Sequence, residues 1–288
     1  MFPSVLLVDK PKGLTSFQVV EDVKRRFKVK VGHTGTLDPI ATGLLILLLD
    51  TATRYAEFFT KLPKEYLATA RLGEIRDTYD AEGTVVEKRE VDITCQDIHS
   101  VLKSFIGRIS QAPPPYSAKR VEGRRAYELA RKGLSVPLKP VEVEIFNAQM
   151  LECQIPQVRF LFCVSSGTYI RSLVHDIGLR LGCGAYVEDL RRTKIGPFDV
   201  SKAISYERLM TLTDLQGIAI PIWSALDFMP AVELDFKNAD KIRKGMFITL
   251  PSYTKEKLFV RLYEGDTFIG VGVVEKNRLR AYRLLPQK

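Results

Sequence analysis

An uninterrupted aliphatic run at residues 44–49 constrains the fold more than any other feature of the chain. Because the run is short and lies between Gly43 and Asp50, it predicts a buried strand. The loop before it, residues 32–43, carries three glycines and a single carboxylate, Asp38. The glycines permit backbone geometry that a Cβ would resist, and Pro39 biases Asp38 toward an extended conformation. An ionisable side chain is therefore held on a stiff backbone at the edge of a buried strand.

Two interpretations of this loop follow from its residues. An Asp-Pro step between glycines is a common turn, in which the carboxylate bonds its own backbone. The same carboxylate at the edge of a buried strand is also a candidate active-site group. A phosphate-binding loop is excluded, because no Lys-Ser or Lys-Thr pair follows Gly43.

Composition narrows the class of protein. With 288 residues and 45% hydrophobic content, the chain can form one large domain or two of unequal size. Its net charge of +9 favours an anionic partner such as nucleic acid. The four cysteines and three histidines show no metal-ligand spacing, so we expect no metal site and no disulfide framework. We expect a cytoplasmic protein, because the first residues do not resemble a signal peptide and no apolar stretch approaches the roughly 20 residues of a membrane span.

Periodicity and capping signals predict the elements around the loop. Thr15 and Gln18 form a capping box for a helix with an apolar face and a basic outer face, which either contacts phosphates or is simply solvated. Thr94 and Asp97 predict a second capped helix, which Gly107 is expected to close. Further predictions are strands at 5–8, 66–72 and 158–164, a helix around 53–60, a helix from 170 to 181, and a short helix starting at Ser205.

Residues 108–140 have a different character, since they carry +6 of the net charge. Three consecutive prolines at 113–115 exclude a helix or an inner strand and predict an exposed arm. Tyr116 and Tyr127 lie among basic residues that include Lys119, Arg120, Arg124 and Arg125. This composition favours contact with RNA through phosphates and stacked bases, although a solvated loop remains the alternative.

Arg171 is predicted in the first turn of a helix that follows a strand. A cation there is poorly placed for the helix dipole, which suggests a buried carboxylate partner. From about Ala231 the chain shortens into strands near 247–250, 258–262, 268–274 and 279–284, and residues 221–230 read as a connection. This spacing predicts a small β barrel at the C-terminal end.

The loop 32–43 resembles the active-site loop of the TruB-type tRNA pseudouridine synthases, whose pattern Gly-His-Thr-Gly-x-Leu-Asp-Pro-x-Ala-Thr-Gly it matches at every fixed position. Four other segments resemble family motifs: Asp-Lys-Pro-x-Gly-x-Thr-Ser at 9–16, Lys-x-Tyr at 64–66, the stretch 76–83, and Gly-Thr-Tyr-Ile-Arg-Ser-Leu at 167–173. The resemblance implies an α+β fold with a mixed, mainly antiparallel catalytic sheet. It also implies a catalytic domain at 1–230 with a basic thumb-like insertion at 108–145, and a PUA-like RNA-binding β barrel at 231–288.

The resemblance also implies roles for individual residues. Asp38 would be the catalytic carboxylate, held ionised by Arg171, which Asp80 would fix in turn. Tyr66 would stack on the target uracil, and Tyr169 and Leu190 would line its pocket. His33 would fill the gap left by the flipped base, although a lone histidine is more often structural.

The implied reaction is the isomerisation of the T-loop uridine, position 55 of tRNA, to pseudouridine. Asp38 could attack C1′ or remove the C2′ proton, and the residues leave both routes open. We expect no cofactor, metal or membrane, and a monomer that works without guide RNA. Two alternatives remain: an RNA-guided dyskerin-type synthase, against which the long arm argues, and a non-catalytic RNA-binding or RNA-folding protein.

Overall fold

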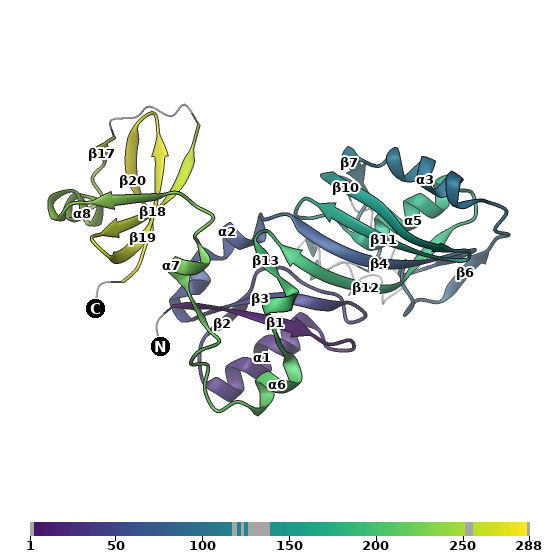
Figure 1. The fold of residues 1–288 in the computed structure, drawn as a ribbon, viewed down its shortest axis with the longest axis horizontal. Coiled ribbons are helices and arrows are strands. Elements are labelled where there is room, and N and C mark those ends of the chain that lie inside the picture. The colour runs from purple at the N-terminus through teal and green to yellow at the C-terminus, as the bar shows by residue number, and fades with distance from the viewer. Residues whose placement is uncertain (1–2, 117–119, 122–123, 126–138, 251–255, 287–288) are drawn as a thin grey trace.

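The computed structural model describes residues 3–116, 120–121, 124–125, 139–250 and 256–286 (Figure 1). Its main feature is an eleven-stranded sheet. Eight strands have the order β14-β1-β3-β12-β4-β11-β10-β7, and β13, β15 and β2 pair with β12, β1 and β3, respectively. The strands are β1 (Ser4–Lys10), β2 (Val31–His33), β3 (Thr42–Leu49), β4 (Lys64–Leu72), β7 (Gly107–Gln111), β10 (Val141–Gln154), β11 (Gln157–Val164), β12 (Ala185–Ile195), β13 (Phe198–Asp199), β14 (Ile204–Ser205) and β15 (Ile220–Pro221). Within this sheet only the β1–β14 and β12–β3 pairs of described strands are parallel, so the predicted mixed, mainly antiparallel sheet is confirmed.

The aliphatic run forms β3 as predicted, and it is buried on both faces. Leu44, Ile46 and Leu48 pack into one hydrophobic cluster, while the alternate residues of the run pack into another. Because successive side chains of a strand point to opposite faces, a strand buried on both sides must be apolar at every position. The helix α1 (Ser16–Phe27) covers one of these faces with Val19, Val20 and Val23, and the Thr15 capping box is formed.

The central part of the sheet buries a third cluster. Along β4 the even-numbered side chains from Lys64 to Leu72 are buried and the odd-numbered ones are partly exposed. The buried side packs against α3 (Cys95–Lys103) and α5 (Ile170–Arg180), which lie on the same side of the sheet (Figure 1). The outer strand β7 extends this part of the sheet by pairing with β10.

Several boundaries differ from the predictions. The helix expected at 53–60 begins as the 3-10 helix η1 (Asp50–Tyr55) and becomes α-helical only in α2 (Ala56–Thr60). The helix α3 ends at Lys103, and Gly107, with φ of +105°, begins β7 instead of closing α3. The connection expected at 221–230 contains the short helix α7 (Ile222–Ala225). The remaining short elements are β5 (Glu74–Arg76), β6 (Val85–Lys88), η2 (Val200–Lys202) and α6 (Tyr206–Thr211), which Ser205 caps.

The C-terminal region forms a separate five-stranded sheet with the order β16-β18-β19-β20-β17. Among the described strands this order is open, so the expected barrel is a half-barrel. Its elements are β16 (Ala231–Leu234), α8 (Phe236–Arg243), β17 (Ile248–Thr249), β18 (Leu258–Glu264), β19 (Thr267–Glu275) and β20 (Arg278–Leu284). The predictions missed β16 and α8. Tyr282 donates a hydrogen bond to Glu57 of α2, and Phe268 packs near Tyr55, which joins the half-barrel to the main sheet.

One expectation from the cysteines was wrong. Cys95, the first residue of α3, and Cys153 on β10 form a disulfide. They lie 58 residues apart, and no spacing rule connects them. Only the packing of α3 onto β10 brings the two sulfur atoms together. Cys163 and Cys183 are free.

Candidate active site

The loop that carries Asp38 is held by hydrogen bonds on both sides of the carboxylate. The Leu37 amide donates to Ser16 Oγ at 2.8 Å, and the Gly13 amide donates to the Pro39 carbonyl at 2.8 Å. Asp38 itself keeps 36% of its side chain exposed. The loop therefore presents the carboxylate to solvent from a fixed backbone.

Arg171 lies in the first turn of α5, and its side chain is 5% exposed. Its Nε is 2.9 Å from Asp38 Oδ2, and its Nη1 is 3.2 Å from Asp80 Oδ2. The unfavourable position on the helix suggested one carboxylate partner for Arg171, and the structure shows two. The arginine thereby joins three distant segments of the chain. One buried guanidinium therefore fixes the partly exposed Asp38 carboxylate relative to the buried Asp80 carboxylate.

Asp80 is itself held in place by its own loop. Thr78 Oγ1 donates to Asp80 Oδ1 at 2.6 Å, and the Glu82 amide donates to the same oxygen at 3.1 Å. Arg171 Nη1 also donates to the Thr78 carbonyl at 3.0 Å. Because every oxygen of this buried carboxylate has a donor, its negative charge is stabilised where solvent does not reach.

The first residues of the arm are bonded to the same helical turn. Arg171 Nη2 donates to the Tyr116 carbonyl at 3.0 Å, and Ser172 Oγ donates to the Ala112 carbonyl at 2.8 Å. The side chain of Gln111 exchanges two hydrogen bonds with the backbone of Tyr169. This stem, residues 111–116, is therefore tied to the helix that carries Arg171 and is not a solvated loop.

The arm is shorter than the predicted insertion at 108–145, because both of its ends belong to the sheet. Residues 108–111 lie in β7 and residues 141–145 begin β10, so the segment outside the sheet is 112–140. Within it, β8 (Arg120–Val121) and β9 (Arg124–Arg125) form a small antiparallel hairpin. Lys119 and Tyr127 lie outside the described residues.

The apolar residues expected around the target base converge in one cluster. Tyr66, Leu190 and Leu37, which precedes Asp38, are all members of the cluster beneath α5. Tyr66 is 8% and Leu190 5% exposed. Tyr169 is the N-cap residue of α5, directly before Ile170 of the same cluster. Strands β4 and β12 and helix α5 thus bring apolar side chains to the loop that carries the carboxylate.

His33 ends β2 on the other side of the loop. Burial, with the nearby charge of Arg192 as a lesser cause, lowers the pKa of His33, so the ring is neutral at physiological pH. Its buried Nδ1 has no hydrogen-bond partner within the described part of the chain. A neutral, partly buried ring is suited to stacking.

Lys10, the lysine of the 9–16 motif, is fully buried beside this site. Its amine donates to the carbonyls of Pro11 and Leu14 at 2.8 and 2.7 Å. Burial lowers its pKa to about 8, and the charge of Asp38 opposes that shift. Lys10 therefore stabilises the turn at residues 11–14, whose Gly13 amide bonds the loop at Pro39.

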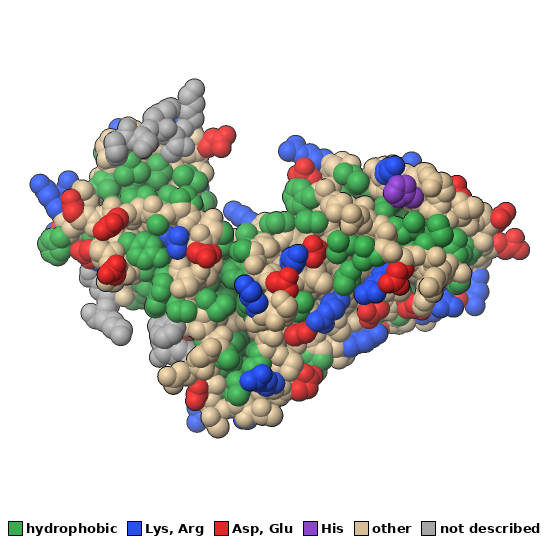
Figure 2. All heavy atoms as spheres, in the orientation of Figure 1, with side chains coloured by type: hydrophobic (Ala, Val, Ile, Leu, Met, Phe, Trp, Pro, Cys, Tyr) green, Lys and Arg blue, Asp and Glu red, His purple; other side chains and the backbone are tan. Residues whose placement is uncertain are grey.

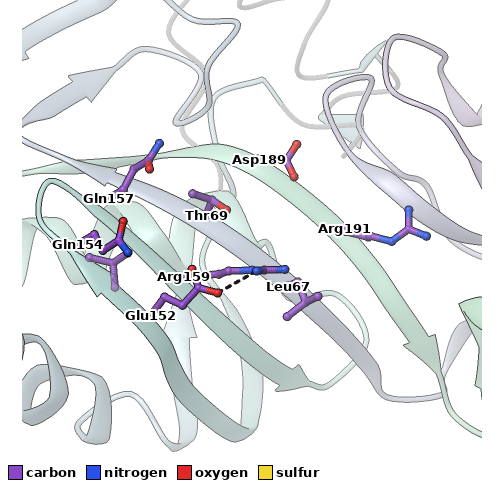
Figure 3. Close-up of a pocket in the computed structure, with 9 residues that line it drawn as sticks. Leu67, Thr69, Glu152, Gln154, Gln157, Arg159, Asp189 and Arg191 are labelled. Atoms are coloured by element: carbon purple, nitrogen blue, oxygen red, sulfur yellow. Dashed lines mark hydrogen bonds and ion pairs between the residues drawn. The ribbon is translucent and has the colours of Figure 1, made fainter.

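The face of the sheet turned to the viewer in Figure 1 is a poor candidate for RNA. Figure 2 shows acidic and basic side chains interspersed over this face, without a single basic field. A hollow of about 310 Å³ lies there, and Figure 3 shows the contact between two of its residues, Arg159 and Glu152. Its other charged residues are also paired, Arg191 with Asp9 and Asp189 with Lys12. The other residues lining it are Leu67, Thr69, Gln154, Gln157 and Val158. The hollow contains none of Asp38, Tyr66 and Arg171.

No group of three or more potential metal-binding His, Cys, Asp or Glu side chains occurs in the described ranges. None of the helices in these ranges is long and apolar enough to cross a membrane. No pattern in the sequence singled out Thr78, the stem contacts or Arg192. Their contacts with the loop and with Arg171 are mostly made to backbone carbonyls, which leave no pattern of residue types in the sequence.

Comparison with known proteins agrees with this geometry. Residues 24–170 match the N-terminal domain of the TruB family pseudouridylate synthases. The chain belongs to the TruB family. Residues 171–222 match the tRNA pseudouridylate synthase B C-terminal domain, and residues 230–285 match the C-terminal region of TruB pseudouridine synthase II.

Individual relatives cover nearly the full length of this TruB-family chain. The tRNA pseudouridine synthase B of Aquifex aeolicus is 46% identical over 283 residues, which is 97% of this chain and 98% of the relative. The enzyme of the same name from Clostridium kluyveri is 41% identical over 285 residues. Among solved structures, the Cbf5-Nop10-Gar1 complex matches with a TM-score of 0.74 at 27% identity, covering 95% of this chain and 79% of the other. The catalytic fold is therefore that of the pseudouridine synthases.

Proposed function

We propose that this chain is a tRNA pseudouridine synthase that converts the T-loop uridine at position 55 with Asp38 as its catalytic carboxylate. The observation that carries the proposal is the pairing of a half-exposed Asp38 with a buried Arg171 that Asp80 holds from the other side. The substrate class is supported by the names of the full-length relatives.

The reaction breaks the bond from C1′ to N1, turns the uracil, and joins C5 to C1′. The proton on C5 is released, N1 gains one, and no electrons are exchanged with another molecule. An ionised Asp38 can attack C1′ directly, or remove the C2′ proton to form a glycal to which the turned base adds. In either route Arg171 pairs with the carboxylate and orients it.

The uridine of a folded loop must first leave its stack, at a cost of a few kcal/mol. In our proposal Tyr66 stacks on the flipped uracil, and Tyr169 and Leu190 complete an apolar pocket for it. His33 would fill the space that the base leaves, which suits its neutral ring. Arg171 and Asp80 then act on the base only through the position of Asp38.

The arm supplies the contact with the rest of the T loop. Its basic residues, including Lys119, Arg120, Arg124 and Arg125, would neutralise phosphates, and its tyrosines would stack on bases. We further propose that residues 1–230 form the catalytic unit and residues 231–288 an accessory PUA-like RNA-binding unit. The protein would act alone on the tRNA T stem-loop, as a monomer.

The RNA-guided alternative is raised by the similarity to a structure titled as an H/ACA RNP bound to a substrate RNA, which has a TM-score of 0.73 and 26% identity. The higher identity and near-complete coverage of the relatives named tRNA pseudouridine synthase B favour the stand-alone reading. The non-catalytic alternative leaves the buried Arg171 and its two carboxylates unexplained.

A release assay tests the proposal. The purified protein is mixed with a tRNA transcript tritiated at uridine C5, in EDTA and without guide RNA, and tritium in the solvent is measured. We expect one equivalent of release per tRNA, and none from a transcript with cytidine at position 55. Release from both transcripts, or from neither, would contradict the assignment.

The variant Asp38→Asn tests the role of the carboxylate. We expect it to abolish release while changing the dissociation constant for tRNA by no more than about tenfold, or about 1.4 kcal/mol, because the carboxylate acts on a base that is already bound. The matched control is Asp77→Asn, which changes a carboxylate whose hydrogen bonds within the described residues go to Thr84 of its own loop. Substantial turnover by Asp38→Asn would remove Asp38 from the mechanism.

A further inference from the structure

Arg192 on β12 occupies a central position in the sheet that the proposed mechanism does not use. In the strand register it lies beside Gly43 of β3 on one side and Tyr66 of β4 on the other. Gly43 ends the loop that carries Asp38, and Tyr66 is the proposed stacking residue. Residue 192 therefore stands between the two halves of the proposed site.

The side chain of Arg192 is 1% exposed and reaches both ends of the catalytic loop. Its Nη2 donates to the Gly35 carbonyl at 3.1 Å and its Nη1 to the Thr36 carbonyl at 3.3 Å, on the entry side. Its Nε donates to the Leu44 carbonyl at 2.8 Å, on the exit side. One planar guanidinium thus spans the loop, with Asp38 between its contact points.

The backbone of Arg192 is in equally close contact with the loop. A Cβ at Gly43 would lie 2.3 Å from the Arg192 carbonyl oxygen, and Gly43 has φ of +102°. A side chain at position 43 would therefore meet both a clash and an unfavourable backbone conformation. Gly43 lets the backbone of β12 lie close to the end of the loop. This close approach allows the guanidinium of Arg192 to bond the carbonyls of the loop.

A buried arginine bonded to carbonyls can have a purely structural role. The unpaired positive charge of Arg192 speaks against such a role here. Its hydrogen-bond partners within the described chain are all backbone carbonyls, and no ion pair joins it to a carboxylate there. The neighbouring Arg191, in contrast, pairs with Asp9 at 2.6 Å. Keeping an unpaired cation buried is costly, so an apolar residue would serve stability better. The planar fork gives a fixed geometry that an apolar residue cannot provide.

We propose that Arg192 is a positioning residue, which holds residues 35–44 so that the Asp38 carboxylate reaches the reacting nucleotide. The proposal rests on the proposed function, because it needs Asp38 to be the group that reacts. Arg192 does not touch the base; it acts through the backbone on either side of Asp38.

The test compares Arg192→Lys and Arg192→Met with wild type by single-turnover release from tritiated tRNA at saturating protein. A lysine keeps the charge but has one nitrogen, so it cannot bond both ends of the loop, and methionine removes the charge. We expect both to lower the rate constant by about 10²-fold, the usual effect of displacing a reacting group by about 1 Å. Binding of tRNA should stay within about tenfold of wild type, because the loop is small compared with the RNA-binding surface.

Arg89→Lys is the matched control. Arg89 also donates to a backbone carbonyl, that of Gly182, and it pairs with Glu87 away from the proposed site. Its rate constant should equal that of wild type. Melting temperatures of all variants are measured so that the rates are compared among folded proteins.

Each outcome decides the proposal. A folded Arg192→Lys with tight binding and a rate constant reduced by about 10²-fold supports it. A rate constant within about threefold of wild type overturns it. So does a loss that is matched by weaker binding, or unfolding of both variants at the assay temperature, since either makes Arg192 a stability residue. If wild type itself releases no tritium, the proposed function has failed, and this result is distinguishable from all the others.

Discussion

A single buried guanidinium illustrates how much the candidate site depends on geometry at the residue scale. Arg171 contacts two carboxylates and two carbonyls with three nitrogen atoms. An ammonium is one point charge with rotating donors and cannot reproduce such a planar set. Replacing Arg171 with lysine therefore removes most of this hydrogen-bond geometry, although the charge is kept.

We predict that Arg171→Lys lowers the single-turnover rate constant by at least about 10²-fold, because Asp38 loses its fixed partner. The control is Arg180→Lys, at the exposed other end of α5. Both are measured at saturating tRNA by tritium release. Near-normal turnover of Arg171→Lys would mean that the ion pair with Asp38 is not needed for the reaction.

Asp176, one position after His175 on α5, provides a pH-dependent prediction. Burial raises the pKa of Asp176 from its ordinary 3.8 to about 6. Near pH 4 the folded carboxyl is protonated and the unfolded one is only about half ionised, so the group changes stability little there. As pH rises to 6 the unfolded chain loses its proton first, so this group destabilises the fold progressively, and the full effect is present above pH 6.

We therefore predict that Asp176→Asn stabilises the protein at pH 8 and not at pH 4. The shift alone corresponds to about 3 kcal/mol, and partial exposure reduces the expected gain to about 1 to 2 kcal/mol. Thermal melts of both proteins at the two pH values measure it. An equal difference at pH 4 and pH 8 would show that the carboxyl does not titrate as expected.

At the scale of elements, the stem of the arm is bonded to the helix that carries Arg171 of the candidate active site. Tyr116 accepts a hydrogen bond from Arg171, and Ala112 accepts one from the adjacent Ser172. The stem is therefore bonded to the same helical turn whose Arg171 pairs with Asp38. Truncating the arm should therefore be more harmful than neutralising its charges.

Neutralising Lys119, Arg120, Arg124 and Arg125 together with alanine should weaken tRNA binding and flatten its salt dependence. Each phosphate contact that is lost should reduce the slope of log K against log salt by roughly 0.7 to 0.9. Saturating RNA should restore much of the rate, because these four changes leave the stem intact. A salt titration of tRNA binding measures the slopes.

A fourfold control separates local contact from net charge. It replaces four exposed basic residues outside the arm with alanine: Lys88, Lys103, Arg159 and Arg180. Both variants lose the same formal charge, so a general field effect would flatten both slopes equally. If only the arm variant changes, the arm contacts phosphates. If the arm variant keeps the wild-type slope, the arm is a solvated loop.

At the scale of the whole molecule, two sheets share part of one core, and a covalent link reinforces the larger sheet. Phe58 of α2 packs against Phe259 and Tyr282 of the half-barrel. The disulfide between Cys95 and Cys153 closes a loop of 58 residues at the opposite end of the catalytic sheet. Such a link stabilises chiefly by restricting the unfolded chain.

We predict that the double variant Cys95→Ser and Cys153→Ser loses about 2 to 4 kcal/mol of unfolding free energy. Its rate at saturating tRNA should be unchanged, because the strand register places Cys153 in line with Val158 and Ala70, four residues along β4 from Tyr66. Cys163→Ser, which changes a free cysteine, is the control. Reductant should lower the melting temperature of wild type and leave that of the double variant unaltered. If reductant has no effect on wild type, the link does not contribute to stability.

The sequence by itself determined the features that depend on neighbours within a few residues. Both capping boxes, the buried β3 strand and the stiff loop around Asp38 follow from local rules, because periodicity, capping and glycine geometry act over one or two turns. The unfavourable place of Arg171 on its helix also predicted a carboxylate partner. The motif resemblance then indicated which carboxylates.

Tertiary structure decided everything that depends on contacts between distant segments. The Cys95–Cys153 link, the reach of Arg192 to both ends of the loop, and the stem bonded to α5 join residues that are 55 to 157 positions apart. Most of these contacts end on backbone carbonyls, which every residue possesses. A carbonyl has no residue type, so no pattern of side chains could have predicted which ones the folded sheet would bring within reach of a buried arginine.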